Sequence, residues 1–368
     1  MIPIYKPYLS KEALKYAHDA VDSTWISSTG KYIELSTDFL KDILQVENLK
    51  LVNNGTSATH LAVKALLKKS PSIKEIVVPN NVYVAAWNSA IYERLRLHPV
   101  DANLDTWNVD LDKLESVLKT KDPQKTAVMV VPNLGNIINT RKLQRAHPDF
   151  LFIEDNCEGF YGKYEDHFSG TGCLASSLSF FGNKTITSGE GGAFITDDKE
   201  VYDFIDKVQG QGQSSQRYIH DVLGYNYRMT NIQAAILYGQ LMILDQIVEK
   251  KMDLFDFYKD NLSPLVERGV MDFQYSEEDT VHSNWIFGLK CKNKCKKIRE
   301  HLNRKGVDTR PMFYDITKHK HIVGHYDTVR IDNARSLQEV CFMIPSYPSI
   351  SIEERAYVVD SIKDFFNE

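Results

Sequence analysis

The chain has 368 residues, a formal net charge of −5 at pH 7 and 43% hydrophobic residues, which is ordinary for a globular protein with room for two domains. That charge provides no basic patch for nucleic acid or for an anionic membrane surface. No apolar run approaches the roughly 20 residues of a membrane span, and the N-terminus lacks a secretory signal pattern. The 5 cysteines therefore indicate reduced, structural thiols in a cytoplasmic protein, and their spacing predicts no metal site.

The N-terminal segment reads as an extended arm followed by a helix. After Ile2-Pro3, the stretch STWISSTGKYIELSTDFLKDIL offers Ser36 or Thr37 as the cap of a helix that runs to about Leu44. We therefore expect this helix to begin only after those hydroxyl residues.

A strand, a turn and a second helix follow in LKLVNNGTSATHLAVKALLKK. A glycine followed by hydroxyl residues at a helix start suits an anion, because free backbone amides and the helix dipole point at it. N-capping by Thr56 or Ser57 explains the same pattern equally well. The residues alone leave both interpretations open.

Strand and helix patterns then alternate from KEIVVPN to FLFIEDN. The apolar runs Ile76 to Val78 and Ala127 to Val131 lack polar alternation, as expected of strands that are covered on both faces. This order predicts an α/β fold with a mostly parallel sheet flanked by helices. Glu154 and Asp155 end one such strand, at the edge where open α/β sheets bind ligands.

The stretch SLSFFGNKTITSGEGGAFIT places one lysine, Lys184, in a glycine-rich loop between two strands. Glycines at this density let the backbone come close to a ligand, and a lysine in such a crowded site suits a covalent bond to a carbonyl group. A β-hairpin with a solvated lysine is the alternative. The spacing fits neither the Walker A pattern nor the dinucleotide-binding fingerprint.

A long helix pattern extends from Asn231 to about Asn261, with Pro264 close behind its end, and the domain boundary falls inside this pattern. The strand WIFGLKC, the helix KCKKIREHLNRKG, a loop rich in tyrosine and histidine, and the helix SIEERAYVVDSIKDFFN then predict a compact α+β unit. We therefore expect a large α/β domain over residues 1–245 and a smaller α+β domain over 246–368.

The lysine loop SFFGNKTITSGEGG resembles the signature of the DegT/DnrJ/EryC1/StrS family of sugar aminotransferases, which use pyridoxal 5'-phosphate. The resemblance extends from IPIYKPYLS through STWISSTG and GYNYRMTNIQAA to LNRKGVDTRPMFY and MIPSYPSIS. It implies fold type I, the fold of aspartate aminotransferase. The family has a large cofactor-binding domain and a smaller C-terminal domain.

The resemblance implies three catalytic residues. Lys184 carries the cofactor, and Asp155, in EDNCEG, holds the cofactor's pyridine nitrogen protonated, which strengthens its pull on carbanion electrons. Taken alone, an aspartate at a strand end is as often a helix cap. Glu158 falls where relatives place a residue near the cofactor's ring hydroxyl or the reacting sugar.

Further cofactor contacts are implied by the same resemblance. The residues expected around the phosphate are Gly55, Thr56, Ser57 and Ser179. Tyr83 matches the aromatic residue that stacks on the cofactor ring, although an ordinary half-buried tyrosine gives the same local pattern. Asn226 matches a residue that reaches the phosphate from the partner subunit, which implies a homodimer with shared active sites.

The implied reaction moves an amine from L-glutamate to the fourth carbon of a nucleotide-linked 4-keto-6-deoxyhexose, because several segments resemble the perosamine branch of the family. Glutamate leaves as 2-oxoglutarate, pyridoxamine 5'-phosphate carries the amine, and a 4-amino-4,6-dideoxy sugar nucleotide of the perosamine or viosamine type is formed. The expected substrate contacts are Trp25, Arg228, Arg310, His319 and His321. For either arginine alone, a surface salt bridge is the alternative.

Two segments depart from the family pattern and leave the substrate open. Residues Pro132 to Gly135 stand where the family often has His-Leu-Tyr-Gly. The segment Phe313 to Thr317 lacks a histidine that the family has there, and His319 or His321 is the expected substitute. A 3-keto sugar aminotransferase, a sugar dehydratase and a non-catalytic binding protein on the same fold are the alternatives. The dehydratases carry histidine in place of the cofactor lysine, so Lys184 disfavours them. The nucleotide (UDP, GDP or dTDP) and the configuration of the sugar (gluco or manno) stay open.

Overall fold

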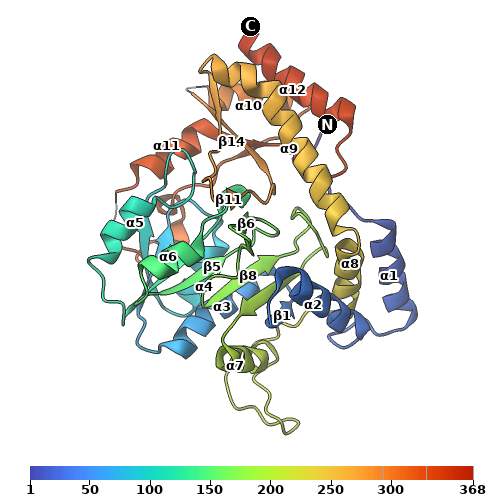
Figure 1. Ribbon diagram of the computed structural model, residues 1–368, viewed down its shortest axis with the longest axis vertical. Helices are drawn as coiled ribbons and strands as arrows, with labels where there is room; N and C mark the ends of the chain where they lie inside the picture. Colours follow the sequence, from blue (N-terminus) through green and yellow to red (C-terminus); the bar gives the residue numbers. More distant parts are fainter. Residues whose placement is uncertain (293, 329, 368) are drawn as a thin grey trace.

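The computed structural model describes residues 1–292, 294–328 and 330–367. Its larger part is built on a seven-stranded sheet in the order β1-β9-β8-β5-β4-β2-β3 (Figure 1). Strands β8, β5, β4, β2 and β3 run parallel, whereas β9 is antiparallel to both β8 and β1. The bounds are β1 Asn48–Val52, β2 Glu75–Pro79, β3 Arg96–Val100, β4 Thr126–Val130, β5 Leu151–Asp155, β8 Ala175–Ser179 and β9 Gly192–Thr196. The expected mostly parallel sheet is confirmed.

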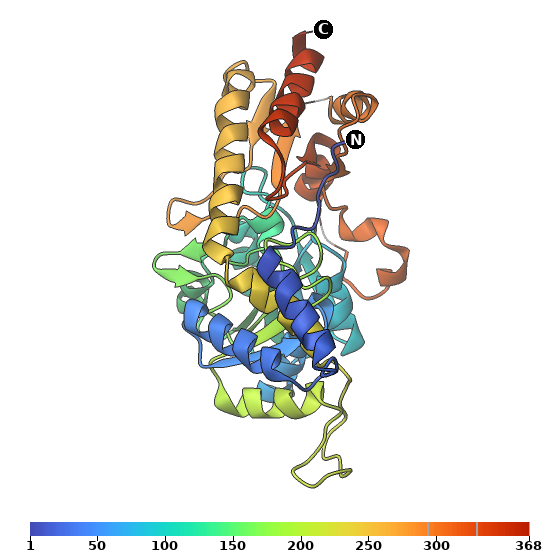
Figure 2. The same cartoon turned by 90° about the vertical axis from the view of Figure 1, so that its right-hand side faces the viewer.

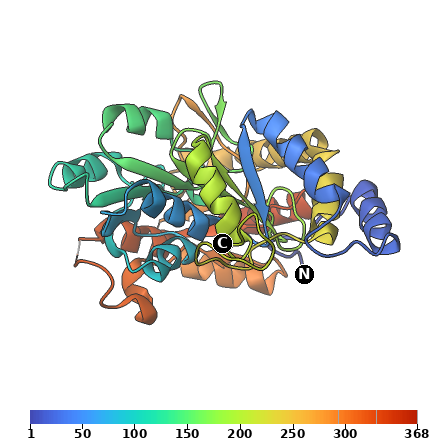
Figure 3. The same ribbon diagram turned by 90° about the horizontal axis from the view of Figure 1, so that it is seen from below.

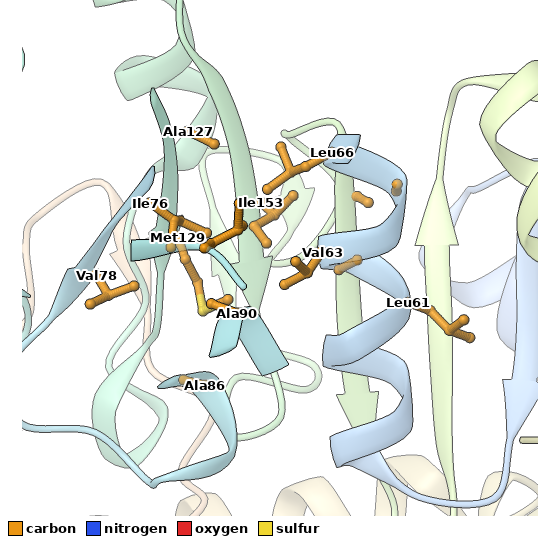
Figure 4. Packing of buried hydrophobic residues seen from close by; sticks show 14 of the residues in the cluster. Leu61, Val63, Leu66, Ile76, Val78, Ala86, Ala90, Ala127, Met129 and Ile153 are labelled. Atoms are coloured by element: carbon orange, nitrogen blue, oxygen red, sulfur yellow. The ribbon is translucent and has the colours of Figure 1, made fainter. Parts of the chain in front are cut away.

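Helices cover both faces of this sheet, which explains the continuous apolar runs. One face packs against α3 (Gly55–Lys69), α4 (Ala85–Tyr92) and α7 (Lys199–Gln209), and Figure 4 shows Val63 and Leu66 of α3 directed toward strands that carry Met129 and Ile153. The other face packs against α5 (Leu111–Leu118) and α6 (Thr140–Ala146), and nearer β1 against α2 (Lys31–Leu44) and α8 (Asn231–Leu241). At that end α1 (Lys11–Asp22) lies beside α8 (Figure 3).

The smaller part contains a four-stranded antiparallel sheet in the order β10-β12-β14-β13. Its strands are β10 Met271–Phe273, β12 Phe287–Cys291, β13 Arg310–Pro311 and β14 Cys341–Ile344, and its helices are α10 Cys295–Arg304, α11 Asp332–Val340 and α12 Ile352–Asn367. A third sheet joins β11 (Thr280–Val281), β6 (Lys163–Tyr164) and β7 (His167–Phe168). In the part of the chain described here, no helix has both the length and the apolar composition to cross a membrane.

Helix α9 (Leu244–Glu267) connects the two parts (Figures 1 and 2). Leu244 and Ile247 pack with the large part, whereas its residues from Leu254 onward pack with the small sheet. The N-terminal arm also reaches the small part, because Ile2 forms a parallel bridge with Val307. The division at residues 245 and 246 therefore falls within the first turn of α9 and stays a prediction.

The predicted start of α2 was wrong, because the helix begins at Lys31 rather than after Ser36 or Thr37. Its first turn is capped from far along the chain: the amide of Tyr32 donates to Oδ1 of Asn231, 3.0 Å away. The Thr37 hydroxyl instead donates back within the helix, to the carbonyl of Ile33. A cap supplied by a residue so distant in sequence leaves no local pattern to read.

The single helix predicted from Asn231 to Asn261 was also wrong. The chain breaks after Leu241 into α8 and α9, and α9 continues past Pro264 to Glu267. Proline has no amide hydrogen for the carbonyl four residues before it, which would normally end a helix. Here the Ser263 hydroxyl donates to the carbonyl of Asp260 at 2.9 Å and supplies the missing donor.

Candidate active site

A cleft of about 820 Å³ lies where the carboxyl ends of the parallel strands face the small part of the molecule. Most of the residues expected at the site line it: Gly55, Thr56, Ser57, Tyr83, Asp155, Glu158, Ser179, Lys184, Arg310 and His319. They come from α3, the loop before α4, the ends of β5 and β8, the loop between β8 and β9, and β13 with the loop after it. The fold thus brings together residues that span most of the chain.

The N-terminus of α3 forms a small polar cradle at one side of this cleft. The N-cap is Asn54, whose Oδ1 accepts from the amide of Ser57 at 2.8 Å, so neither Thr56 nor Ser57 caps the helix. The hydroxyls of Thr56, Ser57 and Ser179 and the first helix amides are donors of the kind that bind a phosphate. A Cβ atom on Gly55 would lie 2.7 Å from Cβ of Ser179, so this cradle needs glycine.

We expect Gly55→Ala to weaken cofactor binding by about 5- to 150-fold, because an overpacked contact of this kind costs about 1–3 kcal/mol. Titration of the cofactor-free protein with pyridoxal phosphate, followed by absorbance, measures the change. Gly210→Ala is the matched control, because a Cβ atom there meets no atom closer than 3.4 Å. Equal affinity of both variants would contradict the cradle.

Asp155 ends β5 at the floor of the cleft and is 6% exposed. Its Oδ1 accepts from the amide of Cys157 and from the Ser177 hydroxyl, both at 3.3 Å. No helix begins at this position, so Asp155 is not a helix cap. Burial raises the pKa of the Cys157 thiol well above its ordinary value, so this neighbour is a neutral thiol.

Glu158 is buried beside Asp155 and accepts from the amide of Leu134 at 2.8 Å through Oε2. Burial raises the pKa of Glu158 to about 7, although the positive charge of Lys184 and this amide oppose the rise. Leu134 has a φ of +58°, a left-handed conformation that is uncommon for leucine. It lies in the segment that departs from the family pattern, and its contribution to the site was not predicted.

The raised pKa of Glu158 predicts how the free energy of unfolding depends on pH. Between pH 4.5 and about 7 the folded chain holds a proton that the unfolded chain releases, so Glu158 lowers the free energy of unfolding as the pH rises through this window. The difference corresponds to up to about 3 kcal/mol. Glu158→Gln should therefore raise the thermal midpoint of the cofactor-free protein at pH 8 and change it little at pH 4.5.

Glu165→Gln is the control for this measurement. The hydrogen bond from Asn139 lowers the pKa of the exposed Glu165 carboxyl, so its removal should give no gain in thermal midpoint at pH 8. A Glu158→Gln variant that is not stabilised at pH 8 relative to pH 4.5 would contradict the protonated state of Glu158 near neutrality.

Lys184 projects into the cleft from the loop between β8 and β9. Its Nζ lies 3.9 Å from the centroid of the Trp285 ring, and the indole N–H of Trp285 donates to the carbonyl of Asn183 at 2.8 Å. Trp285 also lines the cleft, and it was not predicted, because a tryptophan at the start of an apolar strand looks like an ordinary core residue.

The expected substrate residues Arg310, His319 and His321 lie in β13 and in the segment after it, and they differ in whether they face the cleft. Arg310 and His319 line the cleft, with Arg310 paired to Asp308 at 2.7 Å. The ring of His319 packs edge-on against Trp87 at 5.2 Å. His321 is exposed and turned away toward Asn88, at 3.0 Å.

Three other expected residues lie outside the cleft of a single chain. Asn226 and Arg228 are exposed and contact each other at 3.3 Å. Trp25 is 58% exposed and lines a separate hollow of about 670 Å³ beside Tyr32 and Asn231. The structure therefore does not bring these three side chains to the site within one subunit.

The profile of the DegT/DnrJ/EryC1/StrS aminotransferase family matches residues 7–363. The chain belongs to this family. The GDP-perosamine synthase of Escherichia coli O157:H7 is 35% identical over 372 residues, which cover 100% of this chain and 99% of that protein. The GDP-perosamine synthase of Vibrio cholerae is 32% identical over 378 residues and covers 100% of both chains.

Among solved structures, the E. coli GDP-4-keto-6-deoxy-D-mannose-3-dehydratase with bound hydrated PLP has a TM-score of 0.89. It is 22% identical and covers 98% of this chain and 99% of its own, and this likeness concerns the fold. The predicted family, the enzyme class and the fold type I architecture are confirmed for this member of the DegT/DnrJ/EryC1/StrS aminotransferases.

Proposed function

We propose that this chain transfers an amine from L-glutamate to the fourth carbon of a GDP-linked 4-keto-6-deoxyhexose and forms a sugar nucleotide of the perosamine type. The observation that carries the proposal is the cleft in which Lys184, Asp155 and Glu158 lie together with the cradle at α3. The likeness to GDP-perosamine synthases over the whole chain supports GDP as the nucleotide.

The cofactor of this family, pyridoxal 5'-phosphate, fits the residues of the cleft. The cradle at Gly55 has the space and the donors for its phosphate, Asp155 is a buried carboxylate for its ring nitrogen, and Tyr83 is an aromatic face at the cleft wall. When it is bound, the cofactor supplies the electron sink that stabilises a carbanion next to the transferred nitrogen.

The residues of the chain then have distinct roles. Lys184 would anchor the cofactor, and its free Nζ would accept the proton lost by the nitrogen-bearing carbon of glutamate and, in the second half of the reaction, donate a proton to the fourth carbon of the keto sugar. Glu158 holds a proton near neutrality beside the reacting centre, since its pKa is raised to about 7. Arg310 and His319 line the cleft and would contact the sugar nucleotide.

We further propose a homodimer with shared sites. Asn226 and Arg228 lie in the segment between α7 and α8, part of which projects from the body of the chain as a loop (Figures 1 and 2). In that loop Tyr218 is 77% exposed and Leu223 is 78% exposed, which is unusual for such large apolar side chains in an isolated subunit. A second subunit that packs on this loop would bury both side chains. It would also place Asn226 next to the cofactor phosphate in the second subunit's site.

Mixed dimers test this sharing. A dimer of one Lys184→Ala chain and one Asn226→Ala chain has one site in which both defects meet and one site that is intact. A random 1:1 mixture should therefore recover about a quarter of the wild-type turnover per subunit. Subunit exchange is followed with differently tagged chains, and exchange without recovery would contradict the sharing.

The reaction itself is tested with a panel of UDP-, GDP- and dTDP-linked 4-keto-6-deoxy sugars and L-glutamate, with mass spectrometry of the products. We expect an amino sugar nucleotide and 2-oxoglutarate in equal amounts, formed fastest from the GDP-linked manno sugar. An amine-free deoxy product would instead identify a dehydratase, although that alternative is disfavoured by Lys184.

The free state of all 5 cysteines supports the proposal that the enzyme acts in a reducing compartment such as the cytoplasm.

A further inference from the structure

Trp285 joins the small part of the molecule to the lysine loop. It precedes β12, is 6% exposed, and packs in a cluster with Trp107, Leu134 and Met312. One side chain thus makes two contacts with the loop: its ring face meets the amine of Lys184, and its N–H holds the carbonyl of Asn183. The ring and the loop are therefore held together at two points.

Lys251, in the middle of α9, fixes the backbone of Trp285. It is 3% exposed, and its Nζ donates to the carbonyl of Trp285 at 2.7 Å and to the carbonyl of Ser346. Burial lowers the pKa of Lys251 to about 7, and among the described residues no carboxylate forms an ion pair with it. A buried amine without a counter-charge is an unfavourable residue for stability alone.

A positively charged amine over an indole face is attracted by the negative potential of the ring. At 3.9 Å from the ring centroid, the free Lys184 amine occupies such a position, on the wall of the cleft that also contains Asp155 and Glu158. An amine held at a defined point transfers protons faster than one that samples many rotamers, because the reacting atoms are already aligned.

We propose that Trp285 is a catalytic residue that holds the free amine of Lys184 for proton transfer, and that Lys251 is a positioning residue that acts through Trp285. This inference rests on the proposed aminotransferase function. It predicts a loss in kcat rather than in KM, since the contact concerned is with the amine that transfers the proton.

The test compares Trp285→Leu, Trp285→Phe and Lys251→Met in the cofactor-loaded protein. Trp285→Leu removes the ring and should lower kcat by about 30-fold, the factor that corresponds to a desolvated cation–π contact. Trp285→Phe keeps a ring face for the amine but loses the hydrogen bond to Asn183, so its kcat should lie between those of Trp285→Leu and the wild type. Lys251→Met should lower kcat by about 10-fold, as expected when a positioned group shifts by a fraction of an ångström. KM for both substrates should change less than about 3-fold in all of them.

Tyr258→Phe is the matched control for Lys251→Met. Tyr258 is also buried in α9, and its hydroxyl donates to the carbonyl of Pro345, next to Ser346, at 2.8 Å. The control removes a buried hydrogen bond to the same loop without touching Trp285. It should lower the thermal midpoint but leave kcat unchanged.

A second readout does not depend on turnover. Visible circular dichroism per bound cofactor reports how rigidly the cofactor is held, and it should fall in Lys251→Met and Trp285→Leu but not in Tyr258→Phe. Wild-type kcat in Trp285→Leu, or equal losses in Lys251→Met and Tyr258→Phe, would overturn the proposal. If Lys251→Met does not fold, the two Trp285 variants still decide it. The dichroism and the spectral change with L-glutamate alone need no keto sugar, so an error in the sugar substrate would be recognised separately.

Discussion

Lys184→Ala should abolish amine transfer, with a loss of turnover of at least about 10⁴-fold, because it removes both the anchor of the cofactor and the proton carrier. Borohydride reduction of the wild-type holoenzyme, followed by peptide mass spectrometry, should place the cofactor on the peptide that contains Lys184. The variant should yield no labelled peptide.

Lys6→Ala is the control for this experiment, because Lys6 and Lys184 line the same small cavity behind the loop. Its turnover and labelling should match the wild type. A cofactor fixed to Lys6, Lys251 or any lysine other than Lys184 would refute the assignment.

Asp155→Asn should keep the fold but lower kcat by about 10²- to 10³-fold, the size of effect found when one preorganised electrostatic group is removed. An amide accepts from Cys157 and Ser177 as the carboxylate does, so the local hydrogen bonds survive. It cannot, however, keep the pyridine nitrogen protonated. Steady-state kinetics and the thermal midpoint measure the two effects separately.

Asp198→Asn is a suitable control, since this residue caps α7 on the surface and asparagine is an equally good N-cap. It should retain normal turnover. A near-normal kcat in Asp155→Asn would remove Asp155 from the electron-sink role.

Local patterns predicted the elements that carry the fold well. The apolar runs of β2 and β4 indicated strands covered on both faces, and the helix clusters on either side of the sheet confirm this. Local patterns failed where the deciding contact is distant in sequence. Asn231 caps the first turn of α2 although it lies 199 residues beyond Tyr32. The passage of α9 beyond Pro264 was missed for another reason, because the bond from Ser263 to Asp260 is local but a proline normally ends a helix.

The site shows the same division. Lys184, Asp155 and the Gly55 cradle were predicted because each belongs to a motif that can be read along the chain. The amide of Leu134 and the Trp285 ring were not, because their roles depend on a left-handed backbone conformation and on a contact between the two parts of the molecule. Likewise, only the folded chain shows that His319 faces the cleft whereas His321 does not.

The central measurement is the fate of the nitrogen when the purified protein is incubated with ¹⁵N-labelled L-glutamate and a GDP-linked 4-keto-6-deoxymannose. Two-dimensional NMR of the isolated product should show ¹⁵N bonded to the fourth carbon of the hexose, with the nucleotide still attached. Nitrogen on the third carbon, or a product that carries no ¹⁵N, would contradict the proposed reaction.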